Sequence, residues 1–241
     1  MRAIKSFLAL TAIALTGCAT GPTTPPPTFP GIEQSDKITI EDLRPKSESE
    51  KEIFSLMITS SAYAIYRVAD EATAPTGPRL LAHRAYEAFP ELADQPNIKV
   101  RHFVTYANLQ SQLRKGVALG MLTGPIGVAL IGPPTYPASE VVTTPINSAQ
   151  IEKTAGDEEH TRAYFTEQEN PTKAPVNVIY MDTEILGKRV ASRCLVPPVA
   201  GKPSLFLVEA FDMCIANHLA IHRSTSPVTA TNQTKQGISE R

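Results

Sequence analysis

Alternation of apolar and polar residues along the chain predicts a set of strands. The clearest one spans residues 97–106, where Ile98, Val100, His102, Val104 and Tyr106 fall on one side. Similar patterns, or runs of aromatic and β-branched residues, predict further strands over residues 37–41, 63–68, 176–180 and 184–196. Gly187-Lys188, near the start of the last segment, can form a tight turn.

Apolar residues at helical spacing predict helices between these strands. Ser47-Glu48-Ser49-Glu50 has the spacing of a capping box, so a helix with Ile53, Phe54, Leu56 and Met57 on one face is expected after it. A second helix is expected over residues 79–89, before Pro90, and a long apolar one over residues 204–222. Because strands and helices interleave, the sequence predicts an α+β or α/β fold: a single sandwich domain with a central mixed sheet and packed helices.

Composition divides the chain into four parts. Residues 1–17 are a short apolar segment behind Arg2 and Lys5, and residues 18–35 are rich in proline and suit an extended tether. Residues 36–223 are expected to form the globular domain, and residues 224–241 a disordered tail. Without residues 1–17 the chain has 21 basic and 24 acidic residues and no basic stripe, so nucleic acid is not an expected partner.

The N-terminal segment ends in Leu15-Thr16-Gly17-Cys18, behind an apolar core of about nine residues, far shorter than the roughly 20 that span a membrane. This pattern resembles the lipobox of bacterial lipoproteins. The resemblance implies cleavage before Cys18, a diacylglycerol thioether on its sulfur and acylation of the new N-terminus. Since Ala19 rather than Asp follows, resemblance to Gram-negative lipoproteins implies the periplasmic face of the outer membrane, with surface exposure as an alternative. The other interpretations are an ordinary cleaved signal peptide with an incidental cysteine and an uncleaved anchor helix, for which the apolar core is short.

Two further cysteines, Cys194 and Cys214, are expected to form a disulfide in an oxidising compartment, and the alternative is two separate buried thiols. A metal site is not expected there, because no C-x-x-C motif or histidine partner accompanies them.

Residues 116–132 carry no charge, and Gly116, Gly120 and Gly124 follow one another at four-residue spacing. The spacing places small surfaces on one helical face and resembles a glycine zipper, although Pro125 interrupts the segment. Three interpretations are open: a buried hairpin or helix, an element for self-association or membrane insertion, and a mobile loop.

The histidines and acidic residues suggest no clear catalytic site. His102 is expected to be a hydrogen-bonded core histidine, and the pair His218 and His222 to interact with the dipole at a helix C-terminus rather than with a metal. Residues 133–174 form a long connection without clear structure that could dock a partner. Its acidic run, residues 157–160, is expected to be a solvated loop rather than a cation site.

No G-x-S-x-G, phosphate-binding loop or Rossmann fingerprint occurs in the chain. We therefore expect a non-enzymatic outer-membrane lipoprotein that is held by its lipid and binds another envelope protein or itself, with no cofactor besides the covalent lipid on Cys18. The early Ile-Thr-Ile-Glu-Asp-Leu-Arg segment behind the tether also resembles small periplasmic lipoproteins. The alternatives are a tethered hydrolase or cell-wall enzyme that uses His102 or the His218/His222 pair, and a lipoprotein that binds a small ligand.

Overall fold

The computed structural model describes residue 32 and residues 39–111, 113, 141–154, 156–169, 176–196 and 206–224, with side chains in the last range from residue 211 onward. Its elements, in chain order, are β1 (Glu41–Asp42), η1 (Lys46–Ser49), β2 (Glu52–Ile53), β3 (Ile65–Val68), η2 (Asp70–Ala72), α1 (Gly77–Ala88), η3 (Pro90–Ala93), β4 (Ile98–Asn108), β5 (Val142–Ile146), α3 (Ser148–Glu152), η4 (Gly156–Ala163), β6 (Val176–Ile185), β7 (Lys188–Val196) and α4 (Phe206–Ser224). The η elements are 3-10 helices. This mixture of strands and helices confirms the predicted α+β class.

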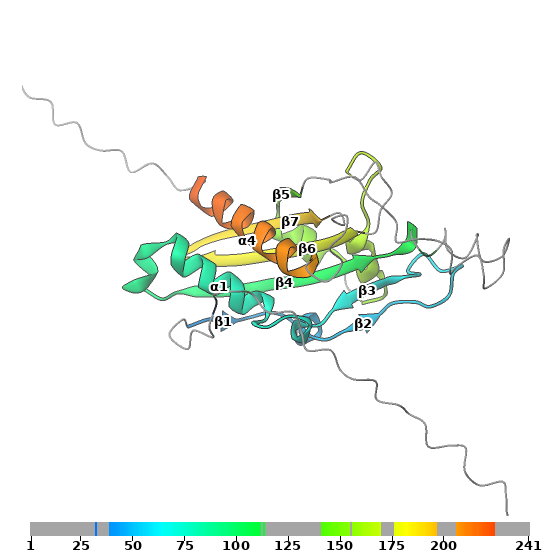
Figure 1. The fold of residues 1–241 in the computed structure, drawn as a ribbon, viewed down its shortest axis with the longest axis horizontal. Coiled ribbons are helices and arrows are strands. Elements are labelled where there is room, and N and C mark those ends of the chain that lie inside the picture. Colours follow the sequence, from blue (N-terminus) through cyan, green and yellow to red (C-terminus); the bar gives the residue numbers. More distant parts are fainter. Residues whose placement is uncertain are drawn as a thin grey trace, which may run out of the picture.

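One sheet connects the strands of the described residues. Its order is β2-β3-β4-β6-β7-β5, with each neighbouring pair antiparallel. β1 pairs in parallel with β4 at Lys99 and Val100, on the edge that β3 occupies further along, at residues 105–108. The long strand β4 thus organises the N-terminal half of the domain (Figure 1), and the sheet is mixed, as predicted.

β6 and β7 form a hairpin whose turn begins one residue before the predicted Gly187-Lys188 turn, so the strand predicted over residues 184–196 is divided between β6 and β7. Leu186 and Gly187 connect them with φ angles of 52° and 78°, so both turn residues are left-handed. This is the combination that a two-residue hairpin turn requires, and glycine adopts it without steric cost. The pairing runs from Ile185 with Lys188 to Asn177 with Val196, so the local turn sets the register of both long strands.

A β-bulge corrects the predicted faces of β4. Val100 is opposite Thr183 and His102 is opposite Asp182, so Arg101 is the extra residue. Ile98, Val100 and Phe103 consequently belong to one core, whereas Val104 and Tyr106 belong to the core on the other face. The expectation that Ile98, Val100, His102, Val104 and Tyr106 share one side is wrong, because the alternation changes phase at the bulge.

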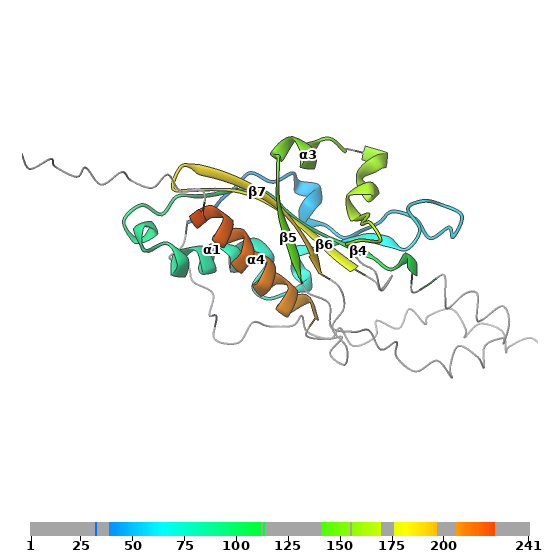
Figure 2. The same cartoon turned by 90° about the horizontal axis from the view of Figure 1, so that it is seen from above.

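Helices cover both faces of the sheet (Figure 2). α1 and α4 pack on one face over a core that includes Leu80, Ile179, Met181 and Ile215. α3 and η4 lie over the other face, where Ile151 and Ala163 join the buried residues of β3, β4 and β6. The elements predicted over residues 63–68, 79–89 and 204–222 correspond to β3, α1 and α4. The strand predicted over residues 37–41 appears as the short β1, with residues 37 and 38 outside the description.

The helix expected after residue 50 is wrong. Ser47 lies in the 3-10 helix η1, and the chain then forms β2, in which Glu52 pairs with Arg67 and Ile53 pairs with Tyr66. The nearby strand β3 offers unpaired backbone groups, and pairing with it satisfies both segments at little loop-closure cost. Phe54 turns inward toward Tyr106, with 6.2 Å between the ring centroids, while Leu56 and Met57 are exposed.

Within the connection over residues 133–174, the described residues 141–154 and 156–169 form more regular structure than expected. β5 adds an edge strand to β7, and Pro145 is tolerated there because the outer side of an edge strand needs no N–H donor. Asn147 and Gln150 then form a capping box that begins α3. β5 was missed because its residues contribute little core of their own and are stabilised by pairing with a strand about 50 residues later in the chain.

Candidate functional site

Two groups of candidate residues predicted from the sequence lie outside the described part of the chain. Cys18, the expected lipidation site, is one of them, and Gly116, Gly120 and Gly124 form the other. The remaining candidates are described, and they form a buried polar region between the sheet and α4, a second polar network on the opposite face, and an exposed apolar loop.

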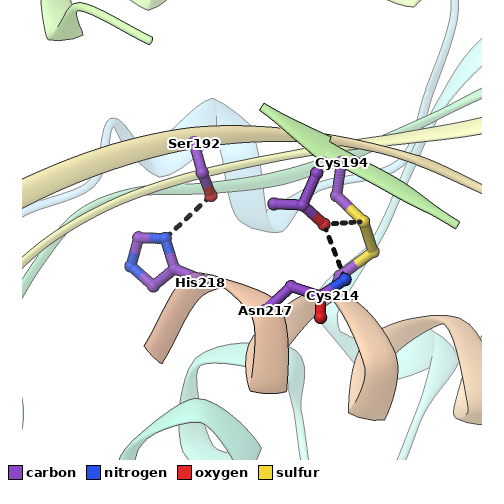
Figure 3. The surroundings of a disulfide bond; sticks show 6 residues. Ser192, Cys194, Cys214, Asn217 and His218 are labelled. Atoms are coloured by element: carbon purple, nitrogen blue, oxygen red, sulfur yellow. Dashed lines mark hydrogen bonds between the residues drawn. A yellow bond between two sulfur atoms is a disulfide. The ribbon is translucent and has the colours of Figure 1, made fainter. Parts of the chain in front are cut away.

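The Cys194–Cys214 disulfide confirms the predicted pairing. It joins β7 to α4, with 5.8 Å between the Cα atoms, and both cysteines are completely buried. Thr143 of β5 donates from Oγ1 to Cys194 Sγ at 3.3 Å and accepts from Asn217 Nδ2 at 3.1 Å (Figure 3). Two strands and one helix are therefore fastened at one point.

Next to the disulfide, a row of hydrogen bonds joins α4 to β6 and β7. Ser192 Oγ lies 2.8 Å from His218 Nδ1 (Figure 3). His218 Nε2 lies 2.7 Å from Thr183 Oγ1. Thr183 Oγ1 is also 2.9 Å from His222 Nε2. One direction gives each of these three contacts a donor: Ser192 donates to His218, the His218 Nε2–H donates to Thr183, and Thr183 donates to His222. In this direction both imidazoles can be neutral.

Burial favours the same neutral state. His218 is 0% exposed and His222 is 2% exposed. Burial, and secondarily the neighbouring His222, lower the pKa of His218 to about 3. Burial and the charge of Lys188 lower the pKa of His222 to about 4, although Asp182 acts in the opposite direction. Because these imidazoles are uncharged near neutral pH, hydrogen bonds to Ser192 and Thr183, and not the expected interaction with the helix dipole, account for their position.

His102 is the hydrogen-bonded core histidine that the sequence predicts. Its Nδ1 lies 2.7 Å from Glu48 Oε1, and Glu48 Oε2 accepts from the backbone N–H of Phe103 at 3.2 Å. Both side chains are buried. The pair joins η1 to the bulged part of β4, directly before the segment in which the sequence suggested a helix.

A second buried network was missed by sequence reasoning. Arg67 of β3 donates to Glu159 Oε1 at 2.5 Å and to Glu52 Oε2 at 2.7 Å. The Tyr106 hydroxyl donates to the same Glu159 oxygen at 2.7 Å and accepts from Arg162 Nη1 at 3.1 Å. Burial, together with the Glu159 charge, raises the pKa of Tyr106, so the phenol remains protonated.

This network corrects the interpretation of the acidic run. Glu159 belongs to η4 and is paired with a buried guanidinium, whereas Asp157 and Glu158 are exposed. Among the described residues, no group of three or more acidic, histidine or cysteine side chains is placed to hold a metal ion. Arg67 and Glu159 are 92 residues apart in sequence, so only the fold brings them together.

The loop between β2 and β3 exposes large apolar side chains. Leu56 is 79% exposed, Met57 69% and Ile58 43%. We call these three residues the apolar tip. The loop extends past the ends of β2 and β3 at one end of the molecule (Figures 1 and 2).

Hydrogen bonds define the conformation of this loop. Ser60 N donates to Met57 O at 2.8 Å, and Met57 N donates to Ser55 Oγ at 3.1 Å. The carbonyl of Ser61 accepts from Gln110 Nε2 at 2.5 Å and from the Tyr164 hydroxyl at 2.9 Å. The apolar tip is therefore presented by a loop that is tied to the end of β4 and to the segment after η4.

Comparisons with known proteins give no relative. The chain matches no protein-family model, no curated protein and no solved structure. Within the described ranges, no helix is both long and apolar enough to cross a bilayer.

Proposed function

We propose that this chain is a lipid-anchored protein of the bacterial outer membrane whose folded domain acts by binding another component of the envelope. The lipobox Leu15-Thr16-Gly17-Cys18 and the proline-rich segment behind it support the anchor and its tether. The Cys194–Cys214 disulfide supports an oxidising compartment, such as the periplasm.

The observation that carries the binding role is the contrast between the apolar tip and the buried polar groups. Three large apolar side chains are in water on a loop held by hydrogen bonds. A patch of this kind commonly marks an interaction site. A tethered hydrolase that uses His102, His218 or His222 would instead need a histidine that reaches substrate. All three are buried and hydrogen-bonded to other side chains.

Cross-linking in intact cells tests this function. The full chain and its Cys18→Ser variant are cross-linked, extracted with detergent, captured and identified by mass spectrometry. We expect a stoichiometric envelope component that is captured with the lipidated chain and lost with the Cys18→Ser variant. The proposal would be contradicted if the full chain and the Cys18→Ser variant were both recovered without a partner and the full chain carried no lipid on Cys18.

A second experiment separates binding from histidine catalysis. Ser192→Ala removes a hydroxyl that contacts His218, and His83→Gln changes a partly exposed histidine of α1 as a control for a histidine outside the buried row. If the domain binds rather than catalyses, both variants retain the captured partner whenever they remain folded. Loss of an envelope phenotype in folded Ser192→Ala, with partner capture intact, would favour the hydrolase.

A further inference from the structure

The apolar tip has a composition that suits lipid. Residues 53–66, which contain the tip, carry no acidic or basic side chain. Serine and threonine flank the three apolar residues, at Ser55, Thr59 and Ser60. Hydroxyl groups can hydrogen-bond to lipid headgroups or water while large apolar side chains enter the hydrocarbon, whereas a carboxylate at this position would oppose insertion.

The same end of the sheet leads into a second uncharged stretch. Leu109 N donates to Ala64 O at 2.9 Å, and Gln110 reaches the Ser61 carbonyl, so the chain after β4 leaves beside the β2–β3 loop. Leu113 is 40% exposed. In the sequence, Arg114 and Lys115 follow, and then 24 residues without charge, residues 116–139. Basic residues beside apolar sequence are typical of segments that meet an anionic lipid surface.

The size and bonding of the tip favour lipid over a protein partner. Three side chains expose on the order of a few hundred Å², less than the roughly 800 Å² that each partner of a stable protein complex buries. Backbone groups of the loop are hydrogen-bonded within the domain, as in the contact of Ser60 N with Met57 O, so the loop does not offer a strand edge for pairing. A bilayer requires no directional bonds.

The tether is long enough for the tip to reach the membrane. Between Cys18 and Thr39 the chain advances 21 residues, which span at most about 65 Å in a polyproline conformation. The tether joins the domain near β1, which pairs with Val100, and the loop lies beyond Asn108 at the other end of β4. The eight-residue advance along β4 from Val100 to Asn108 corresponds to about 26 Å. The anchor and the tip can therefore occupy the same bilayer.

We propose that Leu56, Met57 and Ile58 insert into the lipid bilayer as a second membrane contact that orients the tethered domain. This inference rests on the proposed function, and it assigns lipid as the partner of the apolar tip. The Cys18 anchor supplies most of the membrane affinity, and the tip determines which end of the domain faces the lipid.

Fluorescence tests this insertion directly, because the chain contains no tryptophan. Met57→Trp places an indole on the tip, and Met213→Trp places one at the exposed Met213 of α4, which is 48% exposed and serves as the matched control. Each full-length lipidated variant is reconstituted in vesicles of phosphatidylethanolamine and phosphatidylglycerol, with and without lipids that are brominated on their acyl chains.

We expect blue-shifted emission and bromine quenching for Met57→Trp, and neither effect for Met213→Trp. Adding Leu56→Asn to the Met57→Trp variant should lower the ratio of inserted to uninserted tip about tenfold, because the variant no longer buries one large apolar side chain in the lipid. Equal quenching at both positions, or none at Met57→Trp, would overturn the inference. A blue shift that already exists without vesicles would also overturn it. If that shift is independent of protein concentration, the tip is covered by another part of the same chain. If it depends on concentration, the tip is covered by a second copy.

The result is distinguishable from failure of the proposed function. If the lipidated protein floats with the vesicles while the indole of Met57→Trp stays in water, insertion is wrong and the anchor stands. If mass spectrometry finds no lipid on Cys18, the proposed anchoring fails, and the same vesicle measurement on the unlipidated chain still decides whether the tip inserts.

Discussion

The buried pair His218 and His222 should make the stability of the domain depend strongly on pH. In the folded state their pKa values are about 3 and about 4, whereas unfolded histidines titrate near 6.5. As the pH falls below 6.5, the unfolded chain takes up protons that the folded chain does not. The free energy of unfolding therefore decreases, and the loss continues until the pH approaches the folded pKa values.

The magnitude follows from these values. Each lowered pKa contributes a slope of up to about 1.4 kcal/mol per pH unit, so between pH 7 and pH 5 each histidine lowers the free energy of unfolding by about 2 kcal/mol. The two together give about 4 kcal/mol, a large share of the 5–15 kcal/mol typical of a domain. Carboxylates with lowered pKa, such as Asp42 and Glu169, contribute mainly at lower pH, so this window favours the histidines.

Urea unfolding followed by far-UV circular dichroism at pH 7 and pH 5 measures the effect. His218→Gln keeps an amide that can donate and accept between Ser192 and Thr183 but cannot be protonated, so about half of the pH dependence should disappear. His83→Gln, at a partly exposed position, should leave the dependence close to that of the parent chain. A parent chain that is equally stable at both pH values, or a His218→Gln variant with the parent's pH dependence, would refute the reasoning.

Three further changes test other parts of the structure by urea unfolding. Replacing both Cys194 and Cys214 by alanine should cost about 3 kcal/mol, since the disulfide spans a sequence separation of 20, and unchanged stability would contradict its role. Gly77→Ala should cost about 1–3 kcal/mol, because its Cβ would lie 2.2 Å from Phe103 Cε1, and adding Phe103→Leu should restore part of the loss. Glu159→Gln should cost about 2 kcal/mol by weakening its contact with buried Arg67, whereas exposed Glu158→Gln should change stability little; equal effects would count against the buried network.

Sequence patterns anticipated the elements whose signals are local. Apolar runs predicted strands over residues 176–180 and 184–196 with a turn beside Gly187, and a long apolar segment that carries Cys214 predicted α4. The disulfide followed from cysteine number and the expected compartment. The strands and the helix depend on neighbouring residues, and the disulfide joins the two cysteines that remain besides Cys18. Such features can be predicted before the fold is known.

The errors have one physical origin, which is dependence on distant parts of the chain. Residues 47–57 satisfied the helical pattern, but pairing with β3 gave Ile53 and Phe54 a different environment. The bulge at Arg101 reversed the alternation along β4, which the sequence pattern did not indicate. His218 and His222 were placed on one helix face correctly, yet their charge depended on Thr183 and Ser192 in other strands.

The exposed tip was missed for the same reason. Leu56 and Met57 suit the buried face of a helix, and only the pairing of β2 with β3 turns them into a solvent-exposed loop. Arg67 and Glu159 likewise carried no signal at their separation in sequence. Of the features on which the proposed function depends, the lipobox could be predicted from the sequence, whereas the exposed apolar tip could not.

Site-specific photo-cross-linking in intact cells tests most directly the claim that the anchored domain acts by binding through its apolar tip. A photoreactive amino acid is placed at Met57 or, as the control, at Met213, in the parent chain and in Cys18→Ser. The account predicts an adduct with envelope lipid from position 57 that depends on Cys18 and does not form from position 213. Adducts that are the same at both positions, or that persist unchanged without Cys18, would contradict it.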